Sequence, residues 1–228
     1  MSSVASLANR AWLSLVVLGV IMGALLFGSA GTLRYWQAWV YLFLFFGLSA
    51  LLTRDLLRRD PALLERRMKG GPQAERRPAQ QLIMVVASLA FLSLLVVPGL
   101  DFRHHWSSVP IGAIMLGNVL FVVGFMLVGR VYRENTFTSA TIEIQEGQRV
   151  IDTGPYAIVR HPMYSSALLY MLGTPLALGS YVGLLGVVVM AFVIAWRLVD
   201  EERMLVRGLH GYAEYRERVR FRLIPGVW

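Results

Sequence analysis

Long apolar segments constrain this chain more than any other feature of its sequence. Six of them cover residues 11–30, 36–53, 80–98, 109–129, 163–179 and 181–199. Most are close to the roughly 20 residues that a helix needs to cross the hydrocarbon core of a bilayer. Because lipid offers no partners for free backbone groups, such segments fold as helices. The sequence therefore predicts an all-α integral membrane protein with about six transmembrane helices.

The fifth and sixth segments differ from the other four. The fifth is short, and only Gly179 and Ser180 separate it from the sixth. Gly173 and Pro175, together with Gly179, favour a bent helix that packs closely against its neighbours. We therefore expect the last two spans to form a tight helical hairpin, which need not reach the far face of the membrane. The third segment is expected to stop at Pro98-Gly99.

The basic residues divide the predicted loops into two groups. Of the 22 Lys and Arg residues, only Arg34 and Arg103 fall outside four stretches: the N-terminal stretch, the loops after spans two and four, and the end of the chain from residue 197. With six spans, these four stretches lie on one side of the membrane. The positive-inside rule makes that side cytoplasmic, with both termini inside. In a bacterium, this membrane would be the inner membrane.

The composition excludes several kinds of site. The formal net charge of +8 would suggest nucleic-acid binding in a soluble protein. Here the arginines are better explained as topology determinants and contacts with lipid headgroups, so we expect membrane lipids and no nucleic acid as partners. The chain has no cysteine, which excludes disulfides and thiolate chemistry. Asp101, His104 and His105 share a loop but lack a further convincing ligand, so no metal site is expected.

The polar segments suggest a chain in two parts. The first part, residues 1–129, holds four spans and a basic loop over 54–79. Residues 55–68 mix leucine with arginine and predict an amphipathic interfacial helix interrupted by Pro61, followed by loop over 69–78.

The second part, residues 130–228, holds the two largest polar segments, 130–162 and 196–228. The short hairpin joins them, so they should lie close together on the cytoplasmic side. These are the largest polar segments that could build a site, and residues 209–220 predict a cytoplasmic helical tail.

The first of these segments ends in Arg160-His161-Pro162-Met163-Tyr164. Proline is favoured in the first helical turn, so His161 should sit at the mouth of span five, with Tyr164 one turn inside. The free N–H groups and positive potential of a helix start suit a carboxylate or a phosphate. The alternative is a histidine that caps the helix at the membrane interface, beside a tyrosine of the aromatic belt.

Three consecutive acids, Asp200, Glu201 and Glu202, end the sixth span. Carboxylates there oppose the negative end of the helix dipole. Ionisable groups at membrane depth are functional candidates by default. Arg197 and Glu201 are four residues apart and share a helix face. The alternative is a solvated helix end with an internal ion pair.

At these two segments the chain resembles the isoprenylcysteine carboxyl methyltransferase family and, more distantly, the phospholipid N-methyltransferases. The family pattern is G-x-Y…R-H-P-x-Y, a helical hairpin, E-E-x-x-L, a short spacer, Y-x-x-Y and a proline near the end. This sequence supplies Gly154, Tyr156, Arg160, His161, Pro162, Tyr164, Glu201, Glu202, Leu205, Tyr212, Tyr215 and Pro225. The resemblance covers residues 130–228, whereas the first four spans match only in hydrophobicity.

The resemblance implies S-adenosylmethionine as cofactor, S-adenosylhomocysteine as product, and a methyl acceptor that is lipophilic or embedded in the membrane. By position, the residues that would contact the cofactor are Gln148, Val150, Ile151, Tyr156, His161, Pro162, Tyr164 and Glu201. Gln148 stands where many family members have histidine. Arg197 aligns with an arginine that faces the acceptor, and Arg197 and Glu202 are the candidate catalytic residues.

Two other interpretations stay open at this point. The protein could be a phospholipid N-methyltransferase, or a non-catalytic membrane scaffold or small transporter that has kept the helical pattern. A transporter would have inverted repeats and polar residues at mid-membrane. The polar clusters here lie at the predicted cytoplasmic ends of the spans, which favours an enzyme. The sequence does not distinguish a carboxylate, an amine or a thiol as acceptor.

Overall fold

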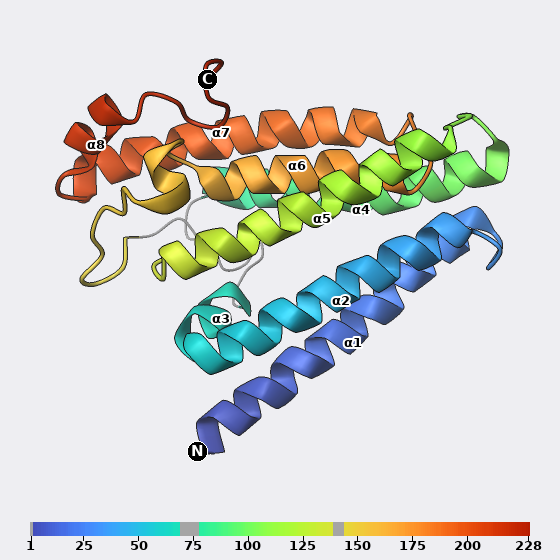
Figure 1. Ribbon diagram of the computed structural model, residues 1–228, viewed down its shortest axis with the longest axis horizontal. Helices are drawn as coiled ribbons and strands as arrows, with labels where there is room; N and C mark the ends of the chain where they lie inside the picture. Colours follow the sequence, from blue (N-terminus) through green and yellow to red (C-terminus); the bar gives the residue numbers. More distant parts are fainter. Residues whose placement is uncertain (1, 69–77, 139–143) are drawn as a thin grey trace.

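A computed structural model describes residues 2–68, 78–138 and 144–228, and the regular elements in these ranges are helices. The six long helices are α1 (Ser2–Ala30), α2 (Trp36–Arg59), α4 (Pro78–His104), α5 (Ile111–Glu134), α6 (Pro162–Ala177) and α7 (Leu184–Gly208) (Figure 1). The short ones are α3 (Pro61–Met68), the 3-10 turn η2 (Gly154–Ala157) and α8 (Tyr212–Arg218). The expected all-α fold is therefore confirmed for the described residues, with one long helix for each predicted span.

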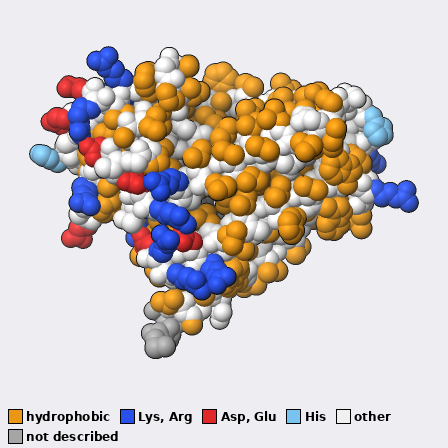
Figure 2. All heavy atoms as spheres, in the orientation of Figure 1, with side chains coloured by type: hydrophobic (Ala, Val, Ile, Leu, Met, Phe, Trp, Pro, Cys, Tyr) orange, Lys and Arg blue, Asp and Glu red, His pale blue; other side chains and the backbone are white. Residues whose placement is uncertain are grey.

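The surface of these helices is that of a membrane protein. Among the described residues, α1, α2, α4 and α5 are long and apolar enough to cross a bilayer. Large apolar side chains face outward from several helices, for example Phe43 with 78% and Phe192 with 73% of its surface exposed. Figure 2 shows hydrophobic side chains over most of the visible face and charged side chains gathered at one end.

The structure corrects one helix boundary and confirms another. The expected stop of the third span at Pro98 is wrong, because α4 continues through this proline to His104. Proline is tolerated within membrane helices when neighbouring groups compensate for the lost hydrogen bond. The expected interruption at Pro61 is confirmed, since α2 ends at Arg59 and α3 begins at Pro61. The predicted loop over 69–78 falls, apart from Pro78, outside the described residues.

The hairpin of α6 and α7 forms as expected, but α6 packs most closely against α5. A Cβ atom at Gly124 would lie 2.5 Å from the backbone nitrogen of Tyr170. A Cβ atom at Gly173 would lie 2.5 Å from the carbonyl oxygen of Gly117. Small residues thus bring the two backbones into contact, as in many membrane helix pairs. The close packing expected at Gly173 is confirmed.

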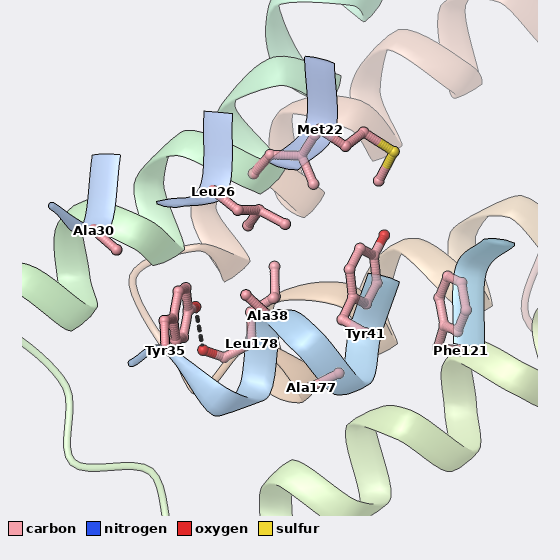
Figure 3. Packing of buried hydrophobic residues seen from close by; sticks show 10 residues of the cluster. Met22, Leu26, Ala30, Tyr35, Ala38, Tyr41, Phe121, Ala177 and Leu178 are labelled. Atoms are coloured by element: carbon pink, nitrogen blue, oxygen red, sulfur yellow. Dashed lines mark hydrogen bonds between the residues drawn. The ribbon is translucent and has the colours of Figure 1, made fainter. Parts of the chain in front are cut away.

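The end of the bundle away from the large polar segments is tied together by buried side chains. Figure 3 shows Met22, Leu26, Tyr35 and Leu178 in one apolar cluster, with the Tyr35 hydroxyl donating to the Leu178 carbonyl at 2.5 Å. Asp101 is also buried here, and its carboxylate accepts hydrogen bonds from the Ser107 and Ser180 hydroxyls at 2.6 and 2.5 Å. These contacts fix the turn of the α6–α7 hairpin, and the opposite end holds the polar segments (Figure 1).

Candidate functional site

The two polar segments that flank the hairpin meet, as the connectivity predicts. The backbone N–H of Arg160 donates to the carbonyl of Phe221 at 2.9 Å, and that of His161 donates to the carbonyl of Arg222 at 3.0 Å. The C-terminal segment therefore lies along the start of α6.

The start of α6 has the geometry that its sequence predicts. His161 is the N-cap residue and Pro162 occupies the first turn. Proline has no N–H, and the N–H groups of Tyr164 and Ser165 donate to the His161 carbonyl at 3.0 and 3.2 Å. This helix start consequently has fewer free donors for an anion than the sequence suggested.

A glycine turn directs Tyr156 toward the site. Gly154 has φ +55°, a backbone conformation that favours glycine, and a Cβ atom there would lie 2.6 Å from Glu134 Oε2. The Tyr156 hydroxyl accepts a hydrogen bond from Asn135 Nδ2 at 3.0 Å, and its carbonyl accepts one from the Tyr215 hydroxyl at 2.7 Å. Tyr156 is thereby held between the end of α5 and α8.

The three consecutive acids of α7 point in three directions, because successive helical residues are about 100° apart. Asp200 accepts a hydrogen bond from Gln80 Nε2 at 2.6 Å. Glu201 accepts one from the Tyr164 hydroxyl at 2.6 Å. Glu202 accepts one from Arg160 Nε at 2.6 Å. Only the middle carboxylate of the three lines the large cavity described below.

Glu202 is the centre of a buried cluster that joins three parts of the chain. Besides Arg160, its carboxylate accepts hydrogen bonds from His161 Nε2 at 3.3 Å and Arg222 Nε at 2.8 Å. Arg160 Nη1 also donates to the carbonyls of Val219 and Arg220, each at 2.8 Å. Burial alone would raise the pKa of the Glu202 carboxyl, but the hydrogen bonds from His161, Arg160 and Arg222 outweigh it and hold that pKa far below its ordinary range. Glu202 is therefore ionised, and its carboxylate is bound to three basic side chains.

Arg197 is held by two different helices. Its Nε donates to the Tyr164 hydroxyl on α6 at 3.2 Å, and its Nη1 donates to Gln80 Oε1 on α4 at 3.2 Å. Gln80 is completely buried and bridges Arg197 to Asp200. An amide can do this because it both donates and accepts.

A cavity of about 550 Å³ lies beside these residues, and Tyr156, Tyr164, Arg197 and Glu201 are in its wall. This size lies within the range of ligand sites in proteins, roughly 300–1,000 Å³. One part of its wall is polar and comes from the segment before α6, from α7 and from α8. The other part is apolar and comes from the membrane helices, with Phe45, Leu52, Met84, Phe91, Phe125, Met171 and Ile194. The cavity thus runs from the polar end of the molecule into the helix bundle.

Eight of the residues proposed from the sequence line this cavity. They are Gln148, Val150, Ile151, Tyr156, His161, Tyr164, Arg197 and Glu201. Neither Pro162 nor Glu202 is among the described lining residues. The side chain of Gln148 accepts a hydrogen bond from the backbone N–H of Gln145 at 2.9 Å, so it shapes the turn that presents Val150 and Ile151.

The cavity carries more positive than negative charge. Among the described residues that line it are four arginines, Arg67, Arg149, Arg160 and Arg197, and a single acid, Glu201. Burial raises the pKa of Tyr156 and of Tyr212 far above its ordinary value, so both hydroxyls stay neutral. Tyr212 lines the cavity, and its hydroxyl is buried with no hydrogen-bond partner within the described part of the chain.

Sequence reasoning missed several residues of this site, and four of them are instructive. Gln80 and Asn135 lie at helix ends, far along the chain from the partners that they contact, and carry no local signal. Arg160 and Tyr212 belong to the motif quoted above, which could have identified them. The sequence could not separate a residue that lines the cavity from one behind its wall.

Comparison with known proteins gives two matches. Residues 113–211 match the family model for phospholipid methyltransferases. The matched region begins in α5 and ends just before Tyr212 at the start of α8. The chain is also 29% identical over 148 residues to protein-S-isoprenylcysteine O-methyltransferase B of Arabidopsis thaliana, a match covering 60% of this chain and 70% of that protein.

The helical membrane fold and these two matches define an enzyme, a membrane methyltransferase. The relation to the isoprenylcysteine carboxyl methyltransferase family, inferred above from the motifs around His161 and Glu201, is confirmed by the same matches.

Proposed function

We propose that the protein transfers a methyl group from S-adenosylmethionine to a lipophilic acceptor at the cytoplasmic face of the membrane. The observation that carries this proposal is that one cavity has both a polar part and an apolar part, with Arg197 in its wall. The cofactor would enter the polar part from the cytoplasm, and the acceptor would enter the apolar part from the bilayer. The proposal includes six membrane spans, both termini in the cytoplasm, and a catalytic region over residues 130–228.

The polar part of the cavity fits the chemistry of the cofactor, which supplies a methyl group on a sulfonium when bound. Glu201 would hold the ammonium group of the amino-acid arm. The faces of Tyr156 and Tyr164 would stabilise the positive sulfur by cation–π attraction, of about 0.5–2 kcal/mol. The buried hydroxyl of Tyr212, which lacks a partner among the described residues, is a polar group that a ligand would satisfy.

His161 would contact the cofactor with its ring, which is stacked near Tyr164 at a centroid distance of 5.8 Å. Pro162 and Glu202 would act indirectly, because they lie behind the cavity wall. Pro162 starts α6, and Glu202 positions Arg160 and His161. Gln148, Val150 and Ile151 would form the cofactor-facing loop.

Arg197 would orient the acceptor and neutralise part of its charge. Arg160 is already paired with Glu202, but the three other arginines of the described lining still outnumber its one carboxylate. This charge favours an acceptor that is already anionic, such as a carboxylate. Such an acceptor needs no general base. The protein's contribution would then be alignment and exclusion of water, effects worth up to roughly 10 kcal/mol.

Phospholipid N-methylation is the second candidate, because the matching family model carries the phospholipid name. An amine acceptor must lose a proton before it attacks. Two groups of the described cavity wall that could take this proton are already bonded within the protein, Glu201 to Tyr164 and His161 Nε2 to Glu202. A cationic amine would also be repelled by Arg197.

Transfer of a labelled methyl group from the cofactor into a membrane extract tests this function. We expect label in a lipophilic product, released by mild alkali as methanol if the acceptor is a carboxylate and retained if it is an amine. Arg197→Ala should lower turnover more than cofactor affinity, whereas Arg218→Ala, at an exposed site outside the cavity, should change neither. No transfer by folded protein, or equal effects of both substitutions, would contradict the proposal.

A further inference from the structure

A second hollow lies on the outer side of the charged end of α7. It has a volume of about 370 Å³ and shares no described lining residue with the first cavity. Its wall includes Arg203, Arg207, Arg216 and Arg222, with Val199 and Val206 between them. We call these six residues the arginine groove.

The groove has an excess of positive charge. Glu202, the one acid among its described lining residues, already accepts hydrogen bonds from Arg160 and Arg222. Arg203, Arg207 and Arg216 are exposed and form no ion pair within the described part of the chain. Three guanidinium groups therefore face one hollow whose described wall has only Glu202 as an anion, and Glu202 is already bonded to other side chains. Such a hollow suits an anionic ligand.

One face of α7 links this groove to the lipid-facing surface. Leu185, Phe192 and Trp196 are 67%, 73% and 52% exposed and lie seven and four residues apart. Val199 and Arg203 follow Trp196 at steps of three and four residues, so all five share one face of the helix. Tryptophan is enriched where the hydrocarbon meets the headgroups. Arg203 lies seven residues beyond Trp196, or about 10 Å along the helix. The groove is thus at the depth of lipid headgroups, directly beyond a surface suited to acyl chains.

We propose that the arginine groove binds the headgroup of an anionic phospholipid, with its acyl chains along the exposed apolar face of α7. The apolar stripe that leads into the groove favours a lipid over a free anion, which would gain nothing from that surface. Basic pockets at the cytoplasmic ends of membrane helices bind such headgroups in general. Arg222 lies between the groove and the Glu202 cluster, so the bound lipid would sit behind the wall of the methyl-transfer site.

The test uses the full-length protein extracted from bilayers of phosphatidylcholine mixed with phosphatidylglycerol, and native mass spectrometry to count retained lipids. We expect preferential retention of phosphatidylglycerol. The double variant Arg203→Gln/Arg207→Gln should lower this preference roughly 10- to 30-fold, as expected for the loss of two arginines near an anionic surface. The matched control Arg54→Gln/Arg58→Gln removes the same charge from the end of α2 and should keep the preference.

Both double variants alter exposed side chains, and equal thermal unfolding midpoints would show that both are folded. Equal retention by the two variants, or no preference in the unaltered protein, would overturn the proposal. Displacement of the lipid by inorganic phosphate alone would also overturn it and indicate a site for soluble anions. None of these outcomes depends on methyl transfer, so the proposed function and the lipid site can fail separately.

Discussion

Arg160 and Glu202 form a buried ion pair, with Arg160 Nε 2.6 Å from Glu202 Oε1 and both side chains 5% exposed. The pair connects the residue before the His161 cap to the last turns of α7. Arg160 Nη1 also donates to the carbonyls of Val219 and Arg220, so the pair is bound to the C-terminal segment. The position of His161 in the cavity wall depends on this pair.

Replacing Glu202 with alanine should destabilise the protein strongly. The substitution leaves the Arg160 guanidinium buried without its counter-charge, a change that typically costs about 3–5 kcal/mol. Unfolding in detergent measures the effect. As control, Asp152→Ala breaks the pair with Arg218, whose side chains are 39% and 65% exposed, and should cost no more than about 1 kcal/mol. Similar losses in both variants would show that the buried pair has no special role.

The Glu202 carboxyl should make the free energy of unfolding depend on pH in the acid range. The folded protein holds the pKa of Glu202 far below its ordinary value of 4.5, because hydrogen bonds from His161, Arg160 and Arg222 outweigh desolvation. A lowered folded-state pKa adds stability above pH 4.5 that is lost as the pH falls below it. The difference in unfolding free energy between the unaltered protein and Glu202→Gln should therefore shrink below that pH. A constant difference would contradict the assignment.

Gln80 should act on turnover through Arg197. Gln80→Leu removes the hydrogen bond to Arg197 Nη1 and the bond to Asp200. A displaced guanidinium should lower kcat by up to about 100-fold. Affinity for S-adenosylhomocysteine should stay nearly unchanged, because Gln80 is not among the described residues of the cavity wall. Gln80→Asn and Gln80→Glu serve as graded controls, and equal losses of kcat and cofactor affinity in Gln80→Leu would indicate a general structural defect.

The contact between α5 and α6 should tolerate no side chain at Gly124. The Cβ atom of alanine would lie 2.5 Å from the Tyr170 nitrogen and 2.9 Å from the Ser166 carbonyl oxygen. Forcing the helices apart should cost about 1–3 kcal/mol, measured by unfolding in detergent. Gly112→Ala on the same helix meets no atom within 4 Å and should be neutral. A neutral Gly124→Ala would mean that the helices are less closely packed.

The sequence predicted the long helices well, because apolar length determines where a chain crosses lipid. It also predicted that the segments on both sides of the hairpin converge, since a short hairpin returns the chain to the same side. The expected stop at Pro98 is wrong because a helix packed among other helices can continue through a proline.

The roles of neighbouring acids could not be predicted in the same way. Glu201 and Glu202 are adjacent in sequence, yet one lines the cavity and the other lies behind its wall. Which way each points depends on the rotation of α7 against α4, α6 and the C-terminal segment. The partnership of Gln80 with Arg197 is similarly a contact between residues 117 positions apart, which no local pattern encodes.

Calorimetric titration of the purified protein with S-adenosylhomocysteine tests the central claim most directly. We expect one molecule to bind per chain, strong loss of binding in Glu201→Ala, and weaker binding by roughly 3- to 10-fold in Tyr212→Phe, the loss of about one hydrogen bond. Glu214→Ala removes an exposed acid of α8 outside the cavity and should bind as the unaltered protein does. Folded protein that fails to bind, or equal binding by Glu201→Ala and Glu214→Ala, would contradict a cofactor site in this cavity.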